Sequence, residues 1–186
     1  MPRNFIFKKE EIVSAALEIA EEGGLDAVTA RAMGAKLGTS SRPVFSYFDS
    51  MTELKDAVVA AADEIHGRYV REEIALGKYP PYKAGGMAYI RFARERKELF
   101  KILFMRERTS ESDEQSKEKD MLIDIICRQV DIDRESAEMF YLEMWTYVHG
   151  IATMIVTGYY DWSEELCSKS LTDMYTGLKY KYENQR

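Results

Sequence analysis

The sequence contains few residues of the kinds that build metal centres, disulfides or catalytic sites. Its two cysteines, Cys127 and Cys167, lie far apart and form no CxxC motif. Its two histidines, His66 and His149, have no other metal-ligating residue at a recognisable spacing. We therefore expect no zinc or other metal site and no cofactor. The scarcity of cysteine is also typical of a reduced, cytoplasmic protein.

Long apolar runs are absent as well. No stretch of eighteen apolar residues occurs, so we expect no transmembrane helix and no membrane partner. The first residues, MPRNFIFKKEE, lack the apolar core of a signal peptide. The 186 residues are 46% hydrophobic, which is enough for one large domain or two small ones with a real core. The formal net charge of -6 argues against indiscriminate binding of nucleic acid but does not exclude a local basic face.

Catalytic motifs are also missing. The sequence has no nucleophile–base–acid arrangement, no glycine-rich phosphate loop and no carboxylate–histidine cluster, so we expect no enzyme activity. Apolar residues recur at helical spacing, without strand-like alternation, which predicts an all-α protein of about nine helices. The predicted helices cover residues 8–22, 41–48, 51–76, 82–95, 97–106, 114–129, 134–160 and 163–183, with one more short helix that starts at Thr29 and ends before Gly38.

One stretch differs from the rest because it contains no acidic residue. Residues 27–48 carry Arg31, Lys36 and Arg42 within an acidic protein. They also have the signals of two short helices joined by a tight turn, with Gly38 where the first helix ends in a left-handed residue. Two helices with such a turn make a helix-turn-helix, whose second helix can enter the DNA major groove. Helix pairs of this kind also occur in all-α proteins that bind no DNA.

The second helix of this pair has its own start signals. Ser40 is a suitable N-cap, and Pro43 falls in the first turn, where a missing N–H costs little. We expect Phe45 and Phe48 to supply the core, which leaves Tyr47 to donate a hydrogen bond to a phosphate. An arginine early in this helix either contacts a guanine edge through two hydrogen bonds or touches only phosphate.

Glycine and proline divide the chain into two regions. Gly77 and the pair Pro80–Pro81 break the helical pattern. We therefore predict an N-terminal three-helix helix-turn-helix unit in residues 1–52 and a C-terminal helical bundle in residues 77–186. The long helix at 51–76 links them and is opened by Ser50 and Glu53, which have capping-box spacing.

Four segments within the first 60 residues follow one another in a recognisable order, AALEIAEEGGLDAVTA, KLGTS, RPVFSYF and SMTEL. They resemble the TetR family of transcriptional repressors, with the glycine, hydroxyl, aromatic and capping positions all in agreement. The resemblance implies that the second and third helices read DNA and that the fourth leads into a variable ligand-binding and dimerisation domain. The shorter stretch WTYVHGIATMI resembles the Trp-His-Gly motif of one TetR C-terminal domain type.

Three residues depart from the family pattern. Met51 stands where lysine is usual, so a phosphate contact is lost or is replaced by Lys55 one turn later. Gly34 stands where alanine is usual, which softens the second helix by up to about 1 kcal/mol. Tyr47 stands where histidine is frequent. These departures leave the operator sequence open.

We predict three groups of functional residues. The predicted DNA contacts are Thr29, Arg31, Thr39, Ser40, Ser41, Arg42, Phe45, Ser46, Tyr47 and Lys55. The predicted site for an apolar or aromatic ligand comprises Tyr89, Phe92, Phe100, Phe104, Trp145, Tyr147, His149 and Met154. The predicted homodimer interface on the last two helices comprises Ile151, Ile155, Gly158, Cys167, Leu171, Met174 and Leu178. Aromatic stripes at helical spacing are also typical of plain core, and His149 either orients a ligand or satisfies a core hydrogen bond.

Together these features predict a sequence-specific, DNA-binding transcriptional regulator, a repressor that a small-molecule effector releases from double-stranded operator DNA. A homodimer of helix-turn-helix units reads two half-sites about 34 Å or a multiple apart, so we expect a (pseudo)palindromic operator. The alternative is a helical small-molecule-binding protein without DNA-binding activity, which Met51 and the net acidity would support.

Overall fold

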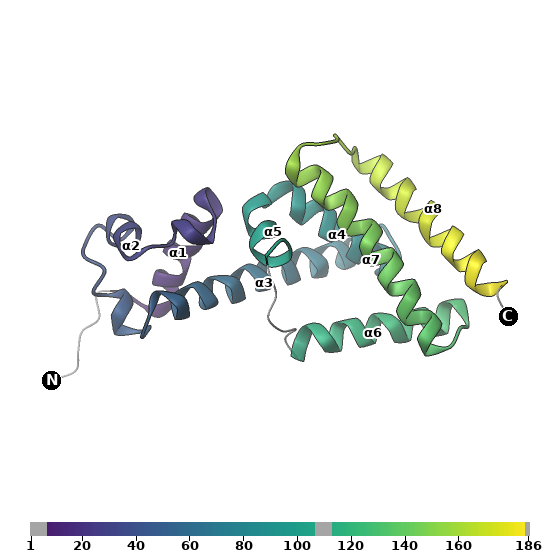
Figure 1. Cartoon of the computed structure of the whole chain (residues 1–186), viewed down its shortest axis with the longest axis horizontal. Helices are drawn as coiled ribbons and strands as arrows, with labels where there is room; N and C mark the ends of the chain where they lie inside the picture. Colours follow the sequence, from purple (N-terminus) through teal and green to yellow (C-terminus); the bar gives the residue numbers. More distant parts are fainter. Residues whose placement is uncertain (1–6, 107–112, 185–186) are drawn as a thin grey trace. The chain divides into compact units, whose positions relative to one another are not determined.

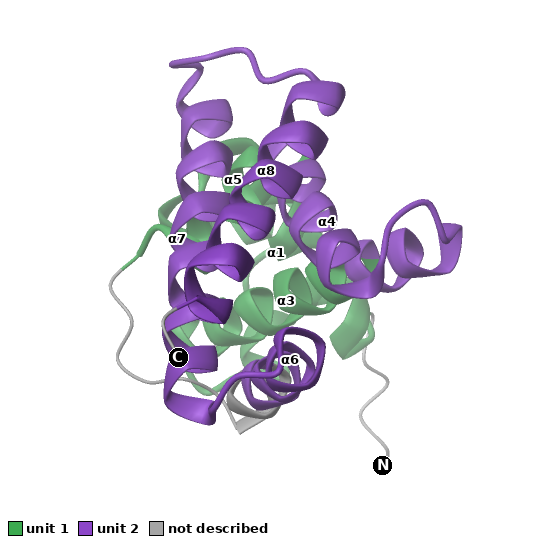
Figure 2. Ribbon diagram, turned by 90° about the vertical axis from the view of Figure 1, so that its right-hand side faces the viewer, with its two compact units in different colours: residues 1–68, 95–106 green, residues 69–94, 107–186 purple. Residues whose placement is uncertain are grey.

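The chain forms two compact units of helices (Figure 2). The computed structural model describes residues 7–106 and 113–184. Unit 1 comprises Met1–Arg68 and Glu95–Arg106, and unit 2 comprises Tyr69–Arg94 and Glu107–Arg186. The described ranges contain eight α-helices, two short 3-10 helices and no strand (Figure 1). The predicted all-α fold is therefore confirmed, with eight α-helices in place of about nine.

Unit 1 is built around the N-terminal helices. Its elements are α1 (Lys9–Gly23), η1 (Leu25–Ala27), α2 (Ala30–Lys36), η2 (Val44–Ser46), the first part of α3 (Met51–Leu76) and α5 (Lys97–Phe104). Ile12, Val44 and Leu54 are fully buried and form its core with Leu99 of α5. Because α5 packs on α1, residues 95–106 belong to this unit although they follow α4 in the chain.

Local signals start and end the helices of unit 1. Thr29 Oγ1 accepts a hydrogen bond from the Ala32 N–H at 3.1 Å and caps α2. Gly38 follows α2 with the expected left-handed φ of 64°. At the start of α3, the Glu53 N–H donates to Ser50 Oγ at 3.2 Å. The Glu53 carboxylate accepts from Asp49 N–H at 2.6 Å, one residue before the position that a capping box requires.

The predicted third helix at 41–48 is wrong in type and length. The structure has a 3-10 turn there, η2, in which the Ser46 N–H donates to Pro43 O at 3.2 Å and the Tyr47 N–H to Val44 O at 3.1 Å. Pro43 offers no N–H, and the β-branched and aromatic residues after it are weak helix formers. Short segments of this kind commonly wind as 3-10 turns.

Unit 2 carries the longest helices of the C-terminal half. Besides the end of α3, it contains α4 (Pro81–Glu95), α6 (Asp113–Val130), α7 (Arg134–Thr157) and α8 (Glu164–Glu183). Ile123, Phe140 and Leu178 belong to one core cluster of α6, α7 and α8. The predicted extension of α7 to residue 160 is wrong, because Gly158 takes a left-handed φ of 68° and ends the helix.

Candidate nucleic-acid interface

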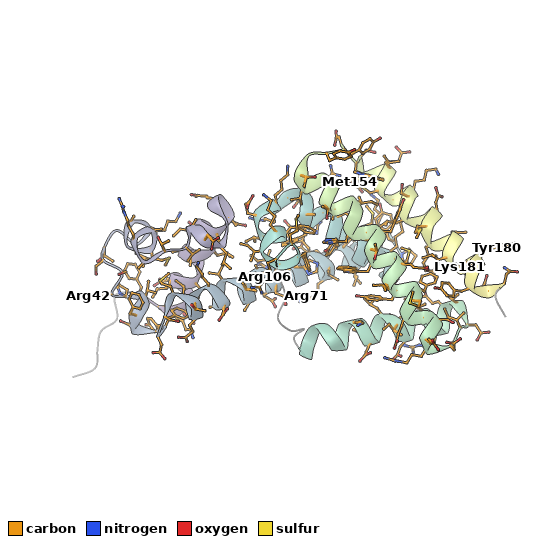
Figure 3. All side chains as sticks on the ribbon, in the orientation of Figure 1. Arg42, Arg71, Arg106, Met154, Tyr180 and Lys181 are labelled. Carbon is orange, nitrogen blue, oxygen red and sulfur yellow. The ribbon has the colours of Figure 1, made fainter. Side chains whose placement is uncertain are left out.

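In the reader segment, residues 29–48, two serine hydroxyls bond to the backbone of one arginine. Ser40 Oγ accepts from the Arg42 N–H at 3.4 Å, and Ser46 Oγ donates to Arg42 O at 3.3 Å. These bonds fix the backbone from which the Arg42 side chain leaves, at the edge of unit 1 (Figure 3). Hydroxyls that support a cation in this way are suited to a surface that meets phosphates.

The predicted DNA contacts divide by exposure. Thr29, Arg31, Thr39, Ser40, Arg42, Phe45 and Ser46 are exposed, whereas Ser41, Tyr47 and Lys55 are half-buried. The expectation that Phe45 supplies core is wrong, because its side chain is 49% exposed. Phe48 is buried as expected, and Val44 is buried as well. The reader segment therefore presents one aromatic ring, together with its polar groups, to the solvent.

The four cations in residues 29–55 are not equivalent. Lys36 Nζ lies 2.7 Å from a Glu18 carboxylate oxygen, and this hydrogen bond raises the pKa of Lys36. Lys55 Nζ lies 3.5 Å from the Asp26 carboxylate. Arg31 and Arg42 have no carboxylate partner among the described residues, so they are the cations that remain for an anionic partner. The sequence of residues 27–48 does not reveal this difference, because the acidic partners Glu18 and Asp26 precede that stretch in the chain.

Tyr47 has an intramolecular partner. Its hydroxyl donates to the backbone carbonyl of Phe7 at 2.9 Å. The sequence offers no signal for this contact, since forty residues separate the two groups.

The residues of the predicted ligand site fall into both units. Phe100 and Phe104 belong to unit 1, with ring centroids 5.2 Å apart. In unit 2, the Tyr89 hydroxyl lies 2.9 Å from His149 Nδ1, and the ring of Trp145 stacks on that of His149 at 5.0 Å. Burial lowers the pKa of His149, which favours the neutral imidazole. Phe92 is fully buried in unit 2, and its ring contacts Tyr69 edge-to-face at 5.4 Å.

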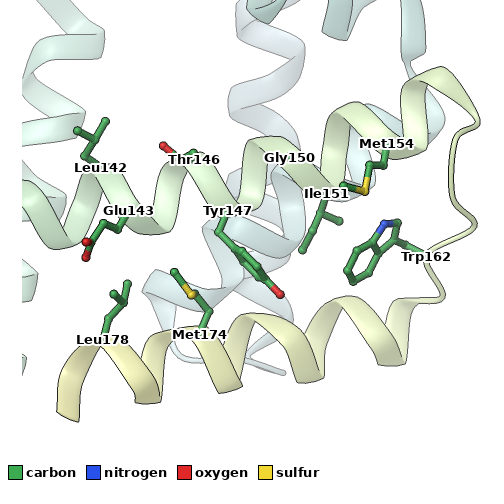
Figure 4. Close-up of a pocket in the computed structure, with 10 residues that line it drawn as sticks. All are labelled: Leu142, Glu143, Thr146, Tyr147, Gly150, Ile151, Met154, Trp162, Met174 and Leu178. Carbon is green, nitrogen blue, oxygen red and sulfur yellow. The ribbon is translucent and has the colours of Figure 1, made fainter. Parts of the chain in front are cut away.

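A groove of about 530 Å³ lies between α7 and α8 (Figure 4). The lining residues are Leu142, Glu143, Thr146, Tyr147, Gly150, Ile151, Met154, Trp162, Met174 and Leu178. The only charged side chain in this lining, Glu143, accepts hydrogen bonds from Lys181 Nζ at 2.7 Å and from the Tyr182 hydroxyl at 3.1 Å. The groove is therefore apolar along nearly all its length.

The lining of the groove includes residues from two of the predicted groups. Tyr147 and Met154 come from the predicted ligand site, and Ile151, Met174 and Leu178 come from the predicted dimer interface. The other predicted interface residues lie elsewhere: Ile155, Cys167 and Leu171 are buried, and Gly158 is exposed at the end of α7.

Leu142, Thr146 and Gly150 line this groove but were not among the predicted site residues. Leu142, Thr146, Gly150 and Met154 follow one another at four-residue spacing along α7 (Figure 4). That spacing marks a single helix face. The row carries no charged residue, and this absence was the signal available in the sequence. We call these four residues the groove face.

Two features are absent from residues 7–106 and 113–184. None of their helices is long and apolar enough to cross a membrane. Nor do three or more histidine, cysteine or acidic side chains gather there in a group that could hold a metal ion.

Similar folds occur among solved regulators. A putative transcriptional regulator from Pseudomonas aeruginosa PAO1 is 14% identical with a TM-score of 0.72, over 99% of this chain and 98% of that one. A TetR variant from Acinetobacter baumannii AYE, in complex with minocycline, is 17% identical with a TM-score of 0.59, over 97% and 98%. The ketosteroid regulator KstR2 of Mycobacterium tuberculosis is 15% identical with a TM-score of 0.57, over 92% and 95%. No curated protein matches the chain by sequence.

The sequence also matches two known families directly. Residues 12–58 match the bacterial regulatory proteins of the tetR family, and residues 82–178 match the tetracyclin repressor-like C-terminal domain. A helix-turn-helix followed by this domain defines a DNA-binding transcriptional regulator. The chain belongs to the tetR family.

Proposed function

We propose that the chain is a repressor that binds a (pseudo)palindromic operator as a homodimer in the cytoplasm and leaves it when a small apolar or aromatic ligand binds. We assign DNA binding to residues 1–52, ligand binding and dimerisation to residues 77–186, and the link between them to α3. The observation that supports the DNA-binding part most directly is the pair Arg31 and Arg42, exposed and without a carboxylate partner in the described part of the chain. The alternative of a helical binding protein without DNA-binding activity is not favoured by the family match of residues 12–58.

Arg42 is the residue that we expect to read a base. Arg42→Ala should weaken binding to operator DNA by about 1–3 kcal/mol, because a bidentate contact to guanine is lost. Binding is measured by a gel shift or fluorescence anisotropy over a series of salt concentrations, on DNA selected by the unmodified protein and on random duplex.

The matched control for this experiment is Lys36→Ala. Lys36 is a cation of the same segment, but its ammonium already bonds Glu18, so its loss should change DNA affinity little. If Arg42→Ala weakened selected and random DNA equally, Arg42 would contact phosphate only and base reading would be rejected.

We infer that the groove face forms the homodimer interface. The interior of such an interface is depleted of charged residues, and Leu142 and Met154 are 49% and 38% exposed on this face in the isolated chain. Ile151, Met174 and Leu178 line the same groove and remain interface residues in this proposal. Ile155, Cys167 and Leu171 support that surface from the core of unit 2.

The effector site is assigned to the aromatic cluster of Tyr89, Trp145 and His149. A neutral imidazole bonded to a tyrosine hydroxyl and stacked on an indole offers flat ring surface together with a few hydrogen-bonding groups. That composition suits an aromatic or polycyclic ligand. Among the structural neighbours, one was solved with minocycline and one is a ketosteroid regulator.

Trp145→Ala should weaken the response to an effector without changing DNA affinity. The substitution removes the ring stacked on His149, whereas the reader segment lies in unit 1. Release of operator DNA is measured by anisotropy against a panel of apolar and aromatic compounds, first with the unmodified protein. Unchanged potency of the active compounds on the variant would place the effector elsewhere.

A further inference from the structure

Among the described residues, two contacts join the start of α1 to the end of the reader segment. The Tyr47 hydroxyl donates to the Phe7 carbonyl at 2.9 Å. Two residues later in the chain, Lys9 Nζ lies 5.0 Å from the centroid of the Phe48 ring, which is itself buried. The adjacent residues Tyr47 and Phe48 thus contact two residues, Phe7 and Lys9, on either side of Lys8.

The Phe7 carbonyl lies just outside helix α1. The helix begins after Lys8, whose N–H donates to the Glu11 carboxylate at 2.7 Å and whose carbonyl accepts from the Ile12 N–H at 3.2 Å. The hydroxyl of Tyr47 therefore supplies the hydrogen bond to the last carbonyl before the helix. This bond fixes the direction in which the chain enters α1.

The chemistry of the hydroxyl limits what else Tyr47 can do. A tyrosine hydroxyl has one proton to donate, and a phosphate diester offers only acceptors. While the proton is bonded to Phe7, Tyr47 cannot also donate it to DNA. The phosphate contact expected from the sequence would require this internal bond to break.

The turn that ends at Tyr47 is short. The 3-10 helix η2 has three residues, and 3-10 hydrogen bonds have poorer geometry than those of an α-helix. Such a turn depends on contacts at its ends to keep one conformation. Tyr47 is its C-terminal cap residue, and Arg42 and Ser46 take their positions from the same turn.

We propose that Tyr47 is a positioning residue of the DNA reader. Its hydroxyl locks the chain that leads into α1 onto the end of η2, and it contacts no phosphate. Tyr47 acts on DNA through the placement of Arg42 and Ser46. This inference rests on the proposed DNA-binding function.

The first test uses the full-length protein without DNA. Tyr47→Phe removes only the hydroxyl and should speed tryptic cleavage after Lys8 and Lys9 about fivefold, the effect of one net hydrogen bond on a local opening equilibrium. Tyr180→Phe, on a side chain that is 70% exposed in α8, is the matched control and should change nothing there. An unchanged cleavage rate in Tyr47→Phe would overturn the proposed lock.

The second test asks whether Tyr47 touches a phosphate. Each phosphate of a duplex selected by the unmodified protein is replaced in turn by a neutral methylphosphonate. If Tyr47 acts only by positioning other residues, Tyr47→Phe should weaken binding of every duplex by the same factor. If one replacement abolished the effect of Tyr47→Phe, or if Tyr47→Phe left DNA affinity unchanged, the positioning role would be overturned. A protein that selects no duplex would refute the proposed function, while the cleavage experiment would still decide the contact with Phe7.

Discussion

Leu142→Glu is expected to give a folded monomer that has lost operator binding. Leu142 is 49% exposed in the isolated chain, so a charge there leaves the monomer stable within about 0.5 kcal/mol. Between two subunits the same charge would be buried without a partner, which costs about 3–5 kcal/mol. The dimer dissociation constant should therefore rise more than roughly a hundredfold. Sedimentation and light scattering measure the assembly, and anisotropy measures DNA affinity.

The matched control is Ile74→Glu. Ile74 is 44% exposed, lies on α3 and does not line the groove. Its replacement adds the same charge to a similarly exposed apolar position and should leave the dimer intact. A dimeric Leu142→Glu protein would contradict the proposed interface, and a monomeric unmodified protein at micromolar concentration would contradict dimerisation itself.

Gly150 is compatible with a dimer contact on the same face. It lies within α7, where glycine costs about 0.5–1 kcal/mol relative to alanine. A Cβ atom added there would meet nothing within 4 Å inside the chain, so internal packing does not require the glycine. Close approach of a partner backbone would require it.

The apolar stripe that the sequence makes most visible is mainly core. Leu171 and Ile155 are only 3% and 8% exposed within one chain. A charge at either position should therefore unfold unit 2 and would not report on dimerisation. Periodicity reveals which face of a helix is apolar, but it does not distinguish burial against the same chain from burial against a partner.

The start and end of α2 and the start of α3 were predictable from the sequence. Thr29 caps α2, Gly38 is left-handed, and Ser50 starts α3, because each depends on residues within one turn. The ion pairs of Lys36 and Lys55 and the bond from Tyr47 to Phe7 could not be predicted. They join residues that only the folded chain brings together.

Gly34 shows that helix propensity alone can predict the wrong sign for a change in protein stability. On helix propensity alone, alanine would stabilise α2 by up to about 1 kcal/mol. In the structure the Thr39 N–H donates to Gly34 O at 3.0 Å, so the turn closes directly over the helix. A Cβ on Gly34 would lie 2.9 Å from Thr39 O and 3.4 Å from backbone atoms of Ser40 and Ser41.

Gly34→Ala is therefore expected to destabilise the protein by about 1–3 kcal/mol, because a backbone turn must move to admit the methyl group. The displaced residues belong to the reader segment, so DNA affinity should fall as well. Urea unfolding measures the first effect through the midpoint concentration, and anisotropy on selected DNA measures the second.

Gly85→Ala is the control for this substitution. Gly85 also lies within a helix, but a Cβ there would meet nothing within 4 Å. The same change should stabilise the protein by about 0.5–1 kcal/mol and leave DNA binding unaltered. If Gly34→Ala destabilised the protein and Gly85→Ala stabilised it, the turn over α2, and not helix propensity, would be the reason for a glycine at position 34. Equal stabilisation by both would mean that the turn at Thr39 relaxes without cost.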